Sequence, residues 1–346
     1  MEDINFDLAE KLGYNRPKSP FRYNDLNFFK EVIKEAEKFD SIRHFQLIVN
    51  SGYKSIYLIF QDGKIEFYEN KINSKIENKI AYFYATGSKL YFVCDTEQIF
   101  VKSKIRDTSR RIEIPANFIK QENYYIKFDF PNNDLEKLDA KDRYVLDIDE
   151  LDPNIIYVEG KGDLTQKYIE DSNEKKASLV RIPDNIFITN INGNNFISHI
   201  LKDTNRRFIN PDLLSGYIGV LFELLNKKII SSGSCFKDGT GFPSVEHTNG
   251  KSIDIPLSES TKVKIKNNKE NPLNEDEIKI VKAFTNFHFT DVITDPLCKS
   301  QIANIGINVR GLQNHKDHFH FTKFDSKKVK NQTEKFEKII ARKNYS

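Results

Sequence analysis

Residues 244–255 read SVEHTNGKSIDI and residues 314–321 read NHKDHFHF, and together they hold four of the seven histidines of the 346-residue chain. In the first segment His247 and Asp254 lie seven residues apart, with Gly250 between them. The residues after Gly250 are expected to form a strand, and glycine permits a sharp turn into it. The spacing therefore predicts that the chain reverses at Gly250 and brings an imidazole and a carboxylate together.

The second segment alternates two kinds of side chain. His318 and His320 alternate with Phe319 and Phe321. Because successive side chains of a strand point to opposite faces, both imidazoles are expected on one face and both aromatic rings on the other. We expect the phenylalanines to pack into the core and the imidazoles to face a cleft.

These residue types are ligands of zinc, which binds imidazole nitrogen and carboxylate oxygen at about 2.0–2.2 Å. A catalytic zinc site uses three protein ligands and one water. His247, Asp254 and His320 would make such an open site. Hydrolysis also requires a group that moves protons, and His315 and His318 are the candidates for that role.

The alternative is that these histidines are ordinary surface or core residues. A single His-x-His on a strand is usually solvated or hydrogen-bonded, and so is a single His and Asp at this spacing. Here HxxGxSxD is followed about sixty residues later by HxxHxH, and so many constrained positions favour the metal interpretation. His44, His199 and His288 have no such neighbours and are interpreted as ordinary residues.

Around these segments the pattern predicts an α+β fold with a small antiparallel sheet. Apolar residues, an opening proline and closing lysines predict a buried helix over 211–228. A helix capped by Asn274 is expected to run through Phe287, with acidic residues in its first turn. The remaining expected elements are strands at 229–232, 252–255, 287–294 and 318–324 and a short helix from Pro296.

The chain before this region is expected to be β-rich. Short runs of Ile, Tyr, Phe and Val separated by turn signals predict a β-meander with hairpins over 44–105, preceded by an amphipathic helix over 25–39. The expected organisation is a β-rich module of unknown delivery or binding role, a catalytic zinc domain and a polar tail. Their expected ranges are 1–175, 176–330 and 331–346.

Composition narrows the class of protein. Hydrophobic residues make up 38% and charged residues 30% of the chain, which indicates a globular protein with a polar surface. The net charge is +3 with both signs interspersed, which argues against nucleic acid as the main partner. Three widely spaced cysteines predict neither a disulfide framework nor a thiolate zinc site, and no apolar run suggests a secretory signal or a membrane span.

The two histidine segments resemble a known family. SVEHTNGKSID is similar to the SxxHxxGxAxD segment of the metallopeptidases that include D-alanyl-D-alanine carboxypeptidases, dipeptidases, phage endolysins and penicillin-insensitive murein endopeptidases. NHKDHFHF resembles the GHxxHxHV segment of the murein endopeptidases, and ITDPLCKSQI resembles the family's preceding strand and short helix. The resemblance covers about 206–324. It implies a murein-endopeptidase-like domain with His247, Asp254 and His320 as zinc ligands and His315 and His318 as further active-site histidines.

The chain also departs from the family pattern. Asp317 stands where carboxypeptidases have a catalytic glutamate, and SGSC at 232–235 replaces an SGYR-like segment whose arginine binds the substrate's terminal carboxylate. Both departures favour an endopeptidase. Lys237 is a possible substitute for the arginine, and Ser252 replaces the usual alanine. Ser244, Lys237 and Asp317 are the residues expected to bind substrate.

The resulting expectation is a zinc-dependent endopeptidase that cleaves peptide cross-links or stems of peptidoglycan. The absence of a signal sequence suggests synthesis in the cytoplasm and action in the periplasm or on the wall after non-standard export. The protein would then be an antibacterial effector that a secretion apparatus exports and that has an immunity protein, or a phage-type lysin. Two alternatives stay open. The first is a cytoplasmic D,D-dipeptidase, carboxypeptidase or amidase acting on small peptides, and the second is a non-catalytic wall-binding protein.

Overall fold

The computed structural model describes most of the chain from Gly52 onward. The described ranges are 52–71, 77–86, 89–106, 144–146, 156–159, 165–189, 195–202, 204, 206–225, 227–241, 245–313 and 315–334. Helices and strands are both present, with one mixed sheet and several small ones, so the α+β class is confirmed. The helix expected over 25–39 lies outside the described residues. Among the described helices, none is both long and apolar enough to cross a membrane.

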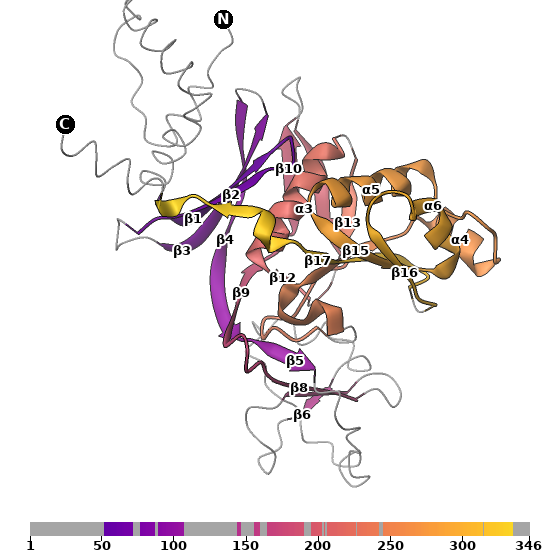
Figure 1. Ribbon diagram of the computed structural model, residues 1–346, viewed down its shortest axis with the longest axis horizontal. Coiled ribbons are helices and arrows are strands. Elements are labelled where there is room, and N and C mark those ends of the chain that lie inside the picture. The colour runs from indigo at the N-terminus through magenta and orange to yellow at the C-terminus, as the bar shows by residue number, and fades with distance from the viewer. Residues whose placement is uncertain are drawn as a thin grey trace, which may run out of the picture. The chain divides into compact units, whose positions relative to one another are not determined.

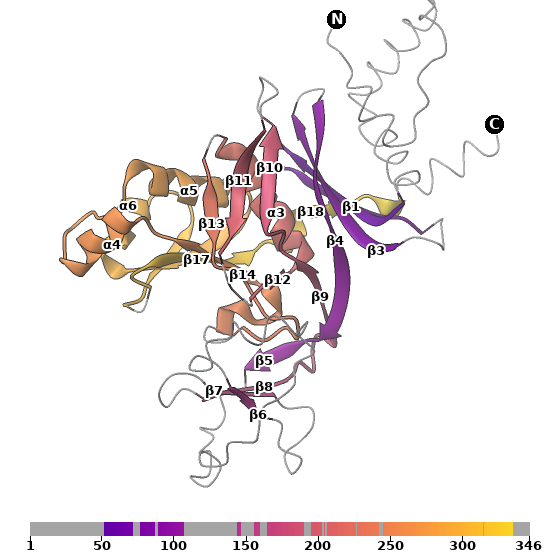
Figure 2. The ribbon, with the colours of Figure 1, turned by 180° about the vertical axis from the view of Figure 1, so that it is seen from behind.

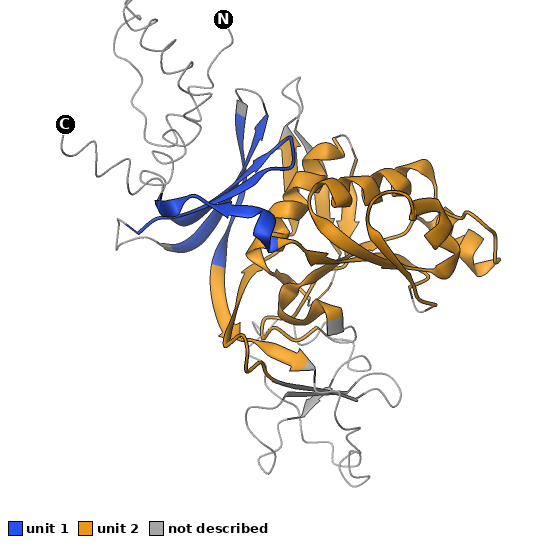
Figure 3. Cartoon of the chain, in the orientation of Figure 1, with its two compact units in different colours: residues 1–97, 326–346 blue, residues 98–325 orange. Residues whose placement is uncertain are grey.

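The chain divides into two compact units, coloured in Figure 3. The first comprises residues 1–97 and 326–346, and the second comprises residues 98–325. The sequence predicted a domain boundary at 175/176 instead. Strand β9 (Lys176–Arg181) pairs antiparallel with residues 98–102 of β4 (Lys89–Lys102). Residues on both sides of the expected boundary therefore belong to the second unit.

The first unit is a sheet built on a hairpin. Strands β1 (Tyr53–Phe60) and β2 (Ile65–Glu69) pair antiparallel, and β18 (Val329–Asn331) adds to β2 in parallel. Strand β3 (Glu77–Thr86) lies on the other side of β1 and pairs with residues 89–97 of β4. One buried hydrophobic cluster of this unit comprises Ile56, Leu58, Tyr68, Ala81 and Phe83.

The expected β-meander is correct for the β1–β2 hairpin and wrong for the next strand. In a meander β3 would pair antiparallel with β2, but here β3 pairs parallel with β1. The chain direction still alternates from strand to strand. Because β3 joins the sheet beside β1 and not beside β2, the same alternation produces a parallel pair.

The second unit begins with short strands. Strands β5 (Lys104–Arg106), β6 (Tyr144–Leu146), β7 (Ile156–Glu159) and β8 (Thr165–Glu170) form an antiparallel sheet in the order β5-β8-β7-β6. Strand β12 (Phe208–Ile209) pairs with β9. A separate sheet has the order β10-β11-β13, with bounds Asn185–Thr189, Asn195–Leu201 and Ile229–Ser231, and its strands lie side by side in Figure 2.

The remainder of the second unit contains the expected helices and strands, but the first helix ends at Glu223 and not at Lys228, and a helix at 259–266 and a strand at 308–311 were not expected. Strands β14 (Ser252–Pro256), β17 (His318–Phe324), β15 (Phe289–Thr294) and β16 (Asn308–Gly311) form a sheet in that order. The sheet was expected to be antiparallel, but β16 pairs parallel with β15. The helical elements are α3 (Pro211–Glu223), η1 (Val245–Gly250), α4 (Glu259–Lys266), α5 (Glu275–Asn286), η2 (Pro296–Cys298) and α6 (Lys299–Ile302), with η3 (Ser326–Lys328) in the first unit.

Helices α3 and α5 lie close to one another in this unit (Figure 1). Helix α3 approaches the segment after α5 so closely that a β-carbon on Gly219 would collide with the Phe287 ring. Helix α5 begins at Asn274 with a capping box, as expected, since Glu277 and Asn274 bond to each other's backbone. The Phe284 ring stacks on Phe321 with centroids 3.6 Å apart. This packing holds β17 against α5.

Candidate metal centre

Strand pairing aligns the first two candidate ligands. Strands β14 and β17 are antiparallel, and Asp254 lies directly opposite His320 in the register. Directly opposed residues point to the same face of a sheet. Phe319 and Phe321 are fully buried, which confirms that they pack in the core.

A tight turn brings the third candidate ligand to this face. In η1 the backbone of Asn249 has φ 59° and that of Gly250 has φ 70°, the left-handed region that Gly and Asn adopt most readily. A β-carbon on Gly250 would lie 2.5 Å from the Asn210 nitrogen, so only glycine fits there. The chain reverses as the sequence predicted, and His247 comes back onto Asp254.

The three side chains form one buried group. The Nε2 atom of His247 lies 2.9 Å from Oδ2 of Asp254, and Nδ1 of His320 lies 2.9 Å from Oδ1 of the same carboxylate. One ligand atom from each residue lies within 4.8 Å of the others. Their exposed fractions are 0%, 4% and 0% for His247, Asp254 and His320. The group is therefore positioned to bind a metal ion.

Two observations test whether the residues fit an ion. Donor atoms bound to a tetrahedral zinc lie about 3.3–3.5 Å apart, so the 2.9 Å separations differ from that spacing by about half an ångström. In addition, while Nδ1 of His320 faces Asp254, the other nitrogen of the ring, Nε2, is buried and has no hydrogen-bond partner among the residues that the structure describes. Buried polar atoms without partners are rare in folded proteins and often mark functional or ion sites. The donor set of two imidazoles and one carboxylate fits a divalent transition metal.

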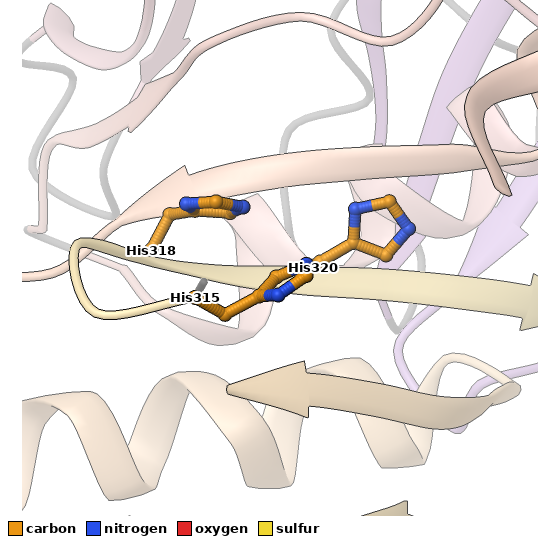
Figure 4. Close-up of side chains that lie close together, drawn as sticks. All are labelled: His315, His318 and His320. Carbon is orange, nitrogen blue, oxygen red and sulfur yellow. The ribbon is translucent and has the colours of Figure 1, made fainter. Parts of the chain in front are cut away.

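His315 and His318 lie beside the group, and Figure 4 shows them with His320. Ligand atoms of these three histidines also lie within 4.8 Å of one another. Asp317 Oδ1 lies 2.7 Å from Nδ1 of His318, and the other ring nitrogen of His318 lies 3.7 Å from Oδ1 of Asp254. The structure therefore brings together both histidines that were expected to move protons and all three expected ligands.

An arginine completes the surroundings of the carboxylate. Arg206 donates from Nη2 to Oδ2 of Asp254 at 2.9 Å and to the Ser232 carbonyl oxygen at 3.4 Å. Burial alone would raise the pKa of Asp254, but the His247 ring and the Arg206 guanidinium hold it well below its ordinary value. The carboxylate is therefore ionised at neutral pH.

The histidines differ in their protonation. Burial lowers the pKa of His247 to about 3, with the charge of Asp254 opposing the shift. Burial also lowers the pKa of His315 to about 4. For His318 burial acts in the same direction, but the hydrogen bond with Asp317 and the charge of Asp254 raise its pKa overall. His247 and His315 are therefore neutral at pH 7, and metal binding requires neutral imidazoles.

The three residues expected to bind substrate have different surroundings. Ser244 lies outside the described residues. Lys237 is exposed, and within the described ranges no hydrogen bond or ion pair joins it to the group. Asp317 contacts His318, and its side chain is 69% exposed. Their roles in substrate binding stay predictions.

Two residues of the centre were not assigned to it from the sequence. Arg206 lies 48 residues before Asp254, and no local pattern links them. Ser252 stands where the family pattern has alanine, and its hydroxyl oxygen lies 2.9 Å from Nδ1 of His247. A polar residue at a position where the resemblance implies an apolar one was the signal that could have identified Ser252.

No family model matches this chain. No curated protein matches it significantly either. The metal-binding interpretation is therefore supported by the residues and their geometry.

Proposed function

We propose that this chain is a zinc-dependent peptidase that hydrolyses peptide bonds of peptidoglycan, as an endopeptidase acting on cross-links or stems. The observation that carries the proposal is the convergence of His247, Asp254 and His320 on one buried point, with His315 and His318 beside it. Two imidazoles and one carboxylate are the ligand set of an open catalytic zinc site. The two adjacent histidines add the proton-transfer groups that hydrolysis needs.

Zinc bound here would polarise the peptide carbonyl and lower the pKa of a water molecule. His318 is suited to move the proton because Asp317 holds its Nδ1 and leaves Nε2 on the side of Asp254. Asp317, the residue before His318, would thereby orient the His318 ring. His315 lies with its ring centroid 4.8 Å from that of His318 and is the second candidate for contact with the reacting groups.

The choice of an endopeptidase rests on the segment at 232–235. The position of the family arginine is occupied by Cys235, which is fully buried. Arg206 does reach the centre, but its guanidinium donates hydrogen bonds to Asp254 and to the Ser232 carbonyl oxygen. A terminal carboxylate therefore has no dedicated arginine at the family position, and an internal peptide bond is the better substrate.

The test combines zinc content with product analysis. Purified protein is subjected to elemental analysis and then incubated with intact peptidoglycan, whose muropeptides are analysed by mass spectrometry. We expect about one zinc per chain and conversion of cross-linked muropeptides into monomers. Stoichiometric zinc with unchanged peptidoglycan would move the substrate to another class of peptide, and absence of zinc would reject the metal centre itself.

Three variants separate the roles of the histidines. His320→Ala should lose zinc and turnover together. His318→Ala should keep about one zinc per chain and lose turnover by about 10²–10⁴-fold, the usual contribution of a general acid or base. His288 has φ 69°, which asparagine tolerates, so His288→Asn is a matched control that should keep both properties. Loss of zinc in His318→Ala would contradict its assignment as a proton carrier.

A further inference from the structure

Ser252 contacts the side of His247 that faces away from the candidate metal site. It is the first residue of β14 and is fully buried, as is His247. Its hydroxyl oxygen lies 2.9 Å from Nδ1 of His247, while Nε2 of the same ring lies 2.9 Å from Asp254. The two contacts together fix both nitrogens of the ring.

The two nitrogens need different partners before and after an ion binds. Without an ion, Nε2 of His247 carries the proton and donates a hydrogen bond to the ionised Asp254. Nδ1 then has no proton and must accept a hydrogen bond. If Nε2 instead binds a metal, the neutral ring carries its proton on Nδ1, which must then donate. A serine hydroxyl can donate in the first state and accept in the second because it rotates. The alanine that the family pattern has at this position can do neither.

We infer that Ser252 is a positioning residue of the metal centre, which holds the His247 ring with Nε2 toward Asp254 and partners Nδ1 in both tautomers. This inference rests on the proposed zinc site. Partners of the second nitrogen of a metal-bound histidine orient the ring and raise its basicity, and their loss commonly weakens metal binding by about 10–100-fold. Ser252 is therefore expected to affect zinc affinity although it does not touch the ion.

The strand opposite offers a matched control. Thr322 lies directly across from Ser252 in the β14–β17 register, is buried, and donates its hydroxyl to the Lys251 carbonyl at 3.5 Å. Thr322→Val removes a buried hydroxyl from the same sheet without touching His247. Ser252→Ala removes the hydroxyl that contacts the ring, and Ser252→Thr restores a hydroxyl at that position.

The experiment measures the zinc dissociation constant of the full chain by competition with a chromophoric chelator. We expect about 10–100-fold weaker binding for Ser252→Ala, recovery to within a few-fold for Ser252→Thr, and no more than about a two-fold change for Thr322→Val. Nitrogen-15 NMR of the zinc-loaded protein adds a second readout. The protonated Nδ1 of His247 should exchange slowly with solvent in the parent and faster in Ser252→Ala.

The outcomes separate the inference from the proposal beneath it. A parent chain that binds no zinc would reject the zinc site. A parent that binds zinc, with Ser252→Ala binding it within two-fold as tightly and with unchanged Nδ1 exchange, would reject the role of Ser252 alone. Equal losses in Ser252→Ala and Thr322→Val would also reject it, because the effect would then belong to the sheet as a whole.

Discussion

His199 lies outside the candidate metal centre and illustrates how burial controls a histidine. It is fully buried in β11, with Nδ1 2.7 Å from the Tyr217 hydroxyl oxygen and Nε2 3.2 Å from the Pro183 carbonyl oxygen. The carbonyl can only accept, so Nε2 carries the proton and Nδ1 accepts from the tyrosine. Burial lowers the pKa of His199 to about 4.

This shift predicts a loss of stability in mild acid. The unfolded chain binds a proton at this histidine near pH 6.5, whereas the folded chain binds it only near pH 4. The unfolded state is therefore favoured progressively as the pH falls from about 6.5 to about 4, by roughly 3 kcal/mol in total. Urea unfolding at a series of pH values in the presence of chelator measures the effect, and His199→Gln should show a shallower decline than the parent.

The other buried histidines are present in both the parent and His199→Gln. The difference between their two curves of unfolding free energy against pH therefore reports His199 alone. Parallel curves for parent and variant would contradict the prediction. A steeper decline in the variant would contradict it as well.

At the scale of residues, the sequence predicts ligands better than their supports. His247, Asp254 and His320 stand in a pattern of fixed spacing, so their convergence could be predicted. Arg206 could not be assigned to the centre, because the contact with Asp254 depends on how segments 48 residues apart fold together. Residues that hydrogen-bond to a ligand from a distant segment are brought there by the three-dimensional fold, so no periodic pattern in the sequence identifies them.

At the scale of elements, the η1 segment is held by a distant part of the second unit. The Asn249 side chain accepts from the Lys104 nitrogen and donates to the Ser103 hydroxyl and the Lys104 carbonyl, all at 2.9 Å. The backbone nitrogen of Asn249 also donates to the Gly239 carbonyl oxygen at 2.7 Å. One buried side chain therefore joins the turn that carries His247 to the residues where β5 begins.

Asn249→Ala is expected to lower the free energy of unfolding by roughly 2–3 kcal/mol, since it leaves buried backbone groups unpaired. Zinc affinity should fall with it, because the turn no longer holds His247. The matched control is Asn268→Ala, since Asn268 has a similar φ of 53° but is exposed. Chemical unfolding and chelator competition provide the two measurements, and equal destabilisation of both variants would show that backbone conformation alone is responsible.

The same scale shows which elements the sequence predicts. The start of helix α5 could be predicted because Asn274 and Glu277 form a local capping signal. The parallel pairing of β1 with β3 could not be predicted, because the strand propensity of β3 is the same whether it pairs with β1 or with β2. Short-range chemistry determines where an element begins, and long-range packing determines which strand it pairs with.

At the scale of the molecule, all the candidate ligands belong to the second unit, residues 98–325. A ligand that binds only the folded state stabilises it by about 2.7 kcal/mol at a concentration 100 times its dissociation constant. Zinc should therefore slow amide exchange of β14 and β17 by up to about 100-fold under those conditions. Strands β1 and β3 in the first unit should exchange at unchanged rates.

Hydrogen exchange followed by mass spectrometry measures both units in one sample. The His320→Ala variant should show no zinc effect in either unit. Equal protection of both units by zinc would contradict the prediction, because it would mean that they open together.

Because Asp254 and His320 lie directly opposite each other, binding of a metal ion at this group would depend on the correct alignment of β14 with β17. If β14 slipped by one residue against β17, the carboxylate would turn to the face opposite the imidazole. Such a slipped chain could keep its apolar character and still pair its backbone, but it could not chelate. Metal content would then measure the fraction of correctly aligned molecules in a preparation.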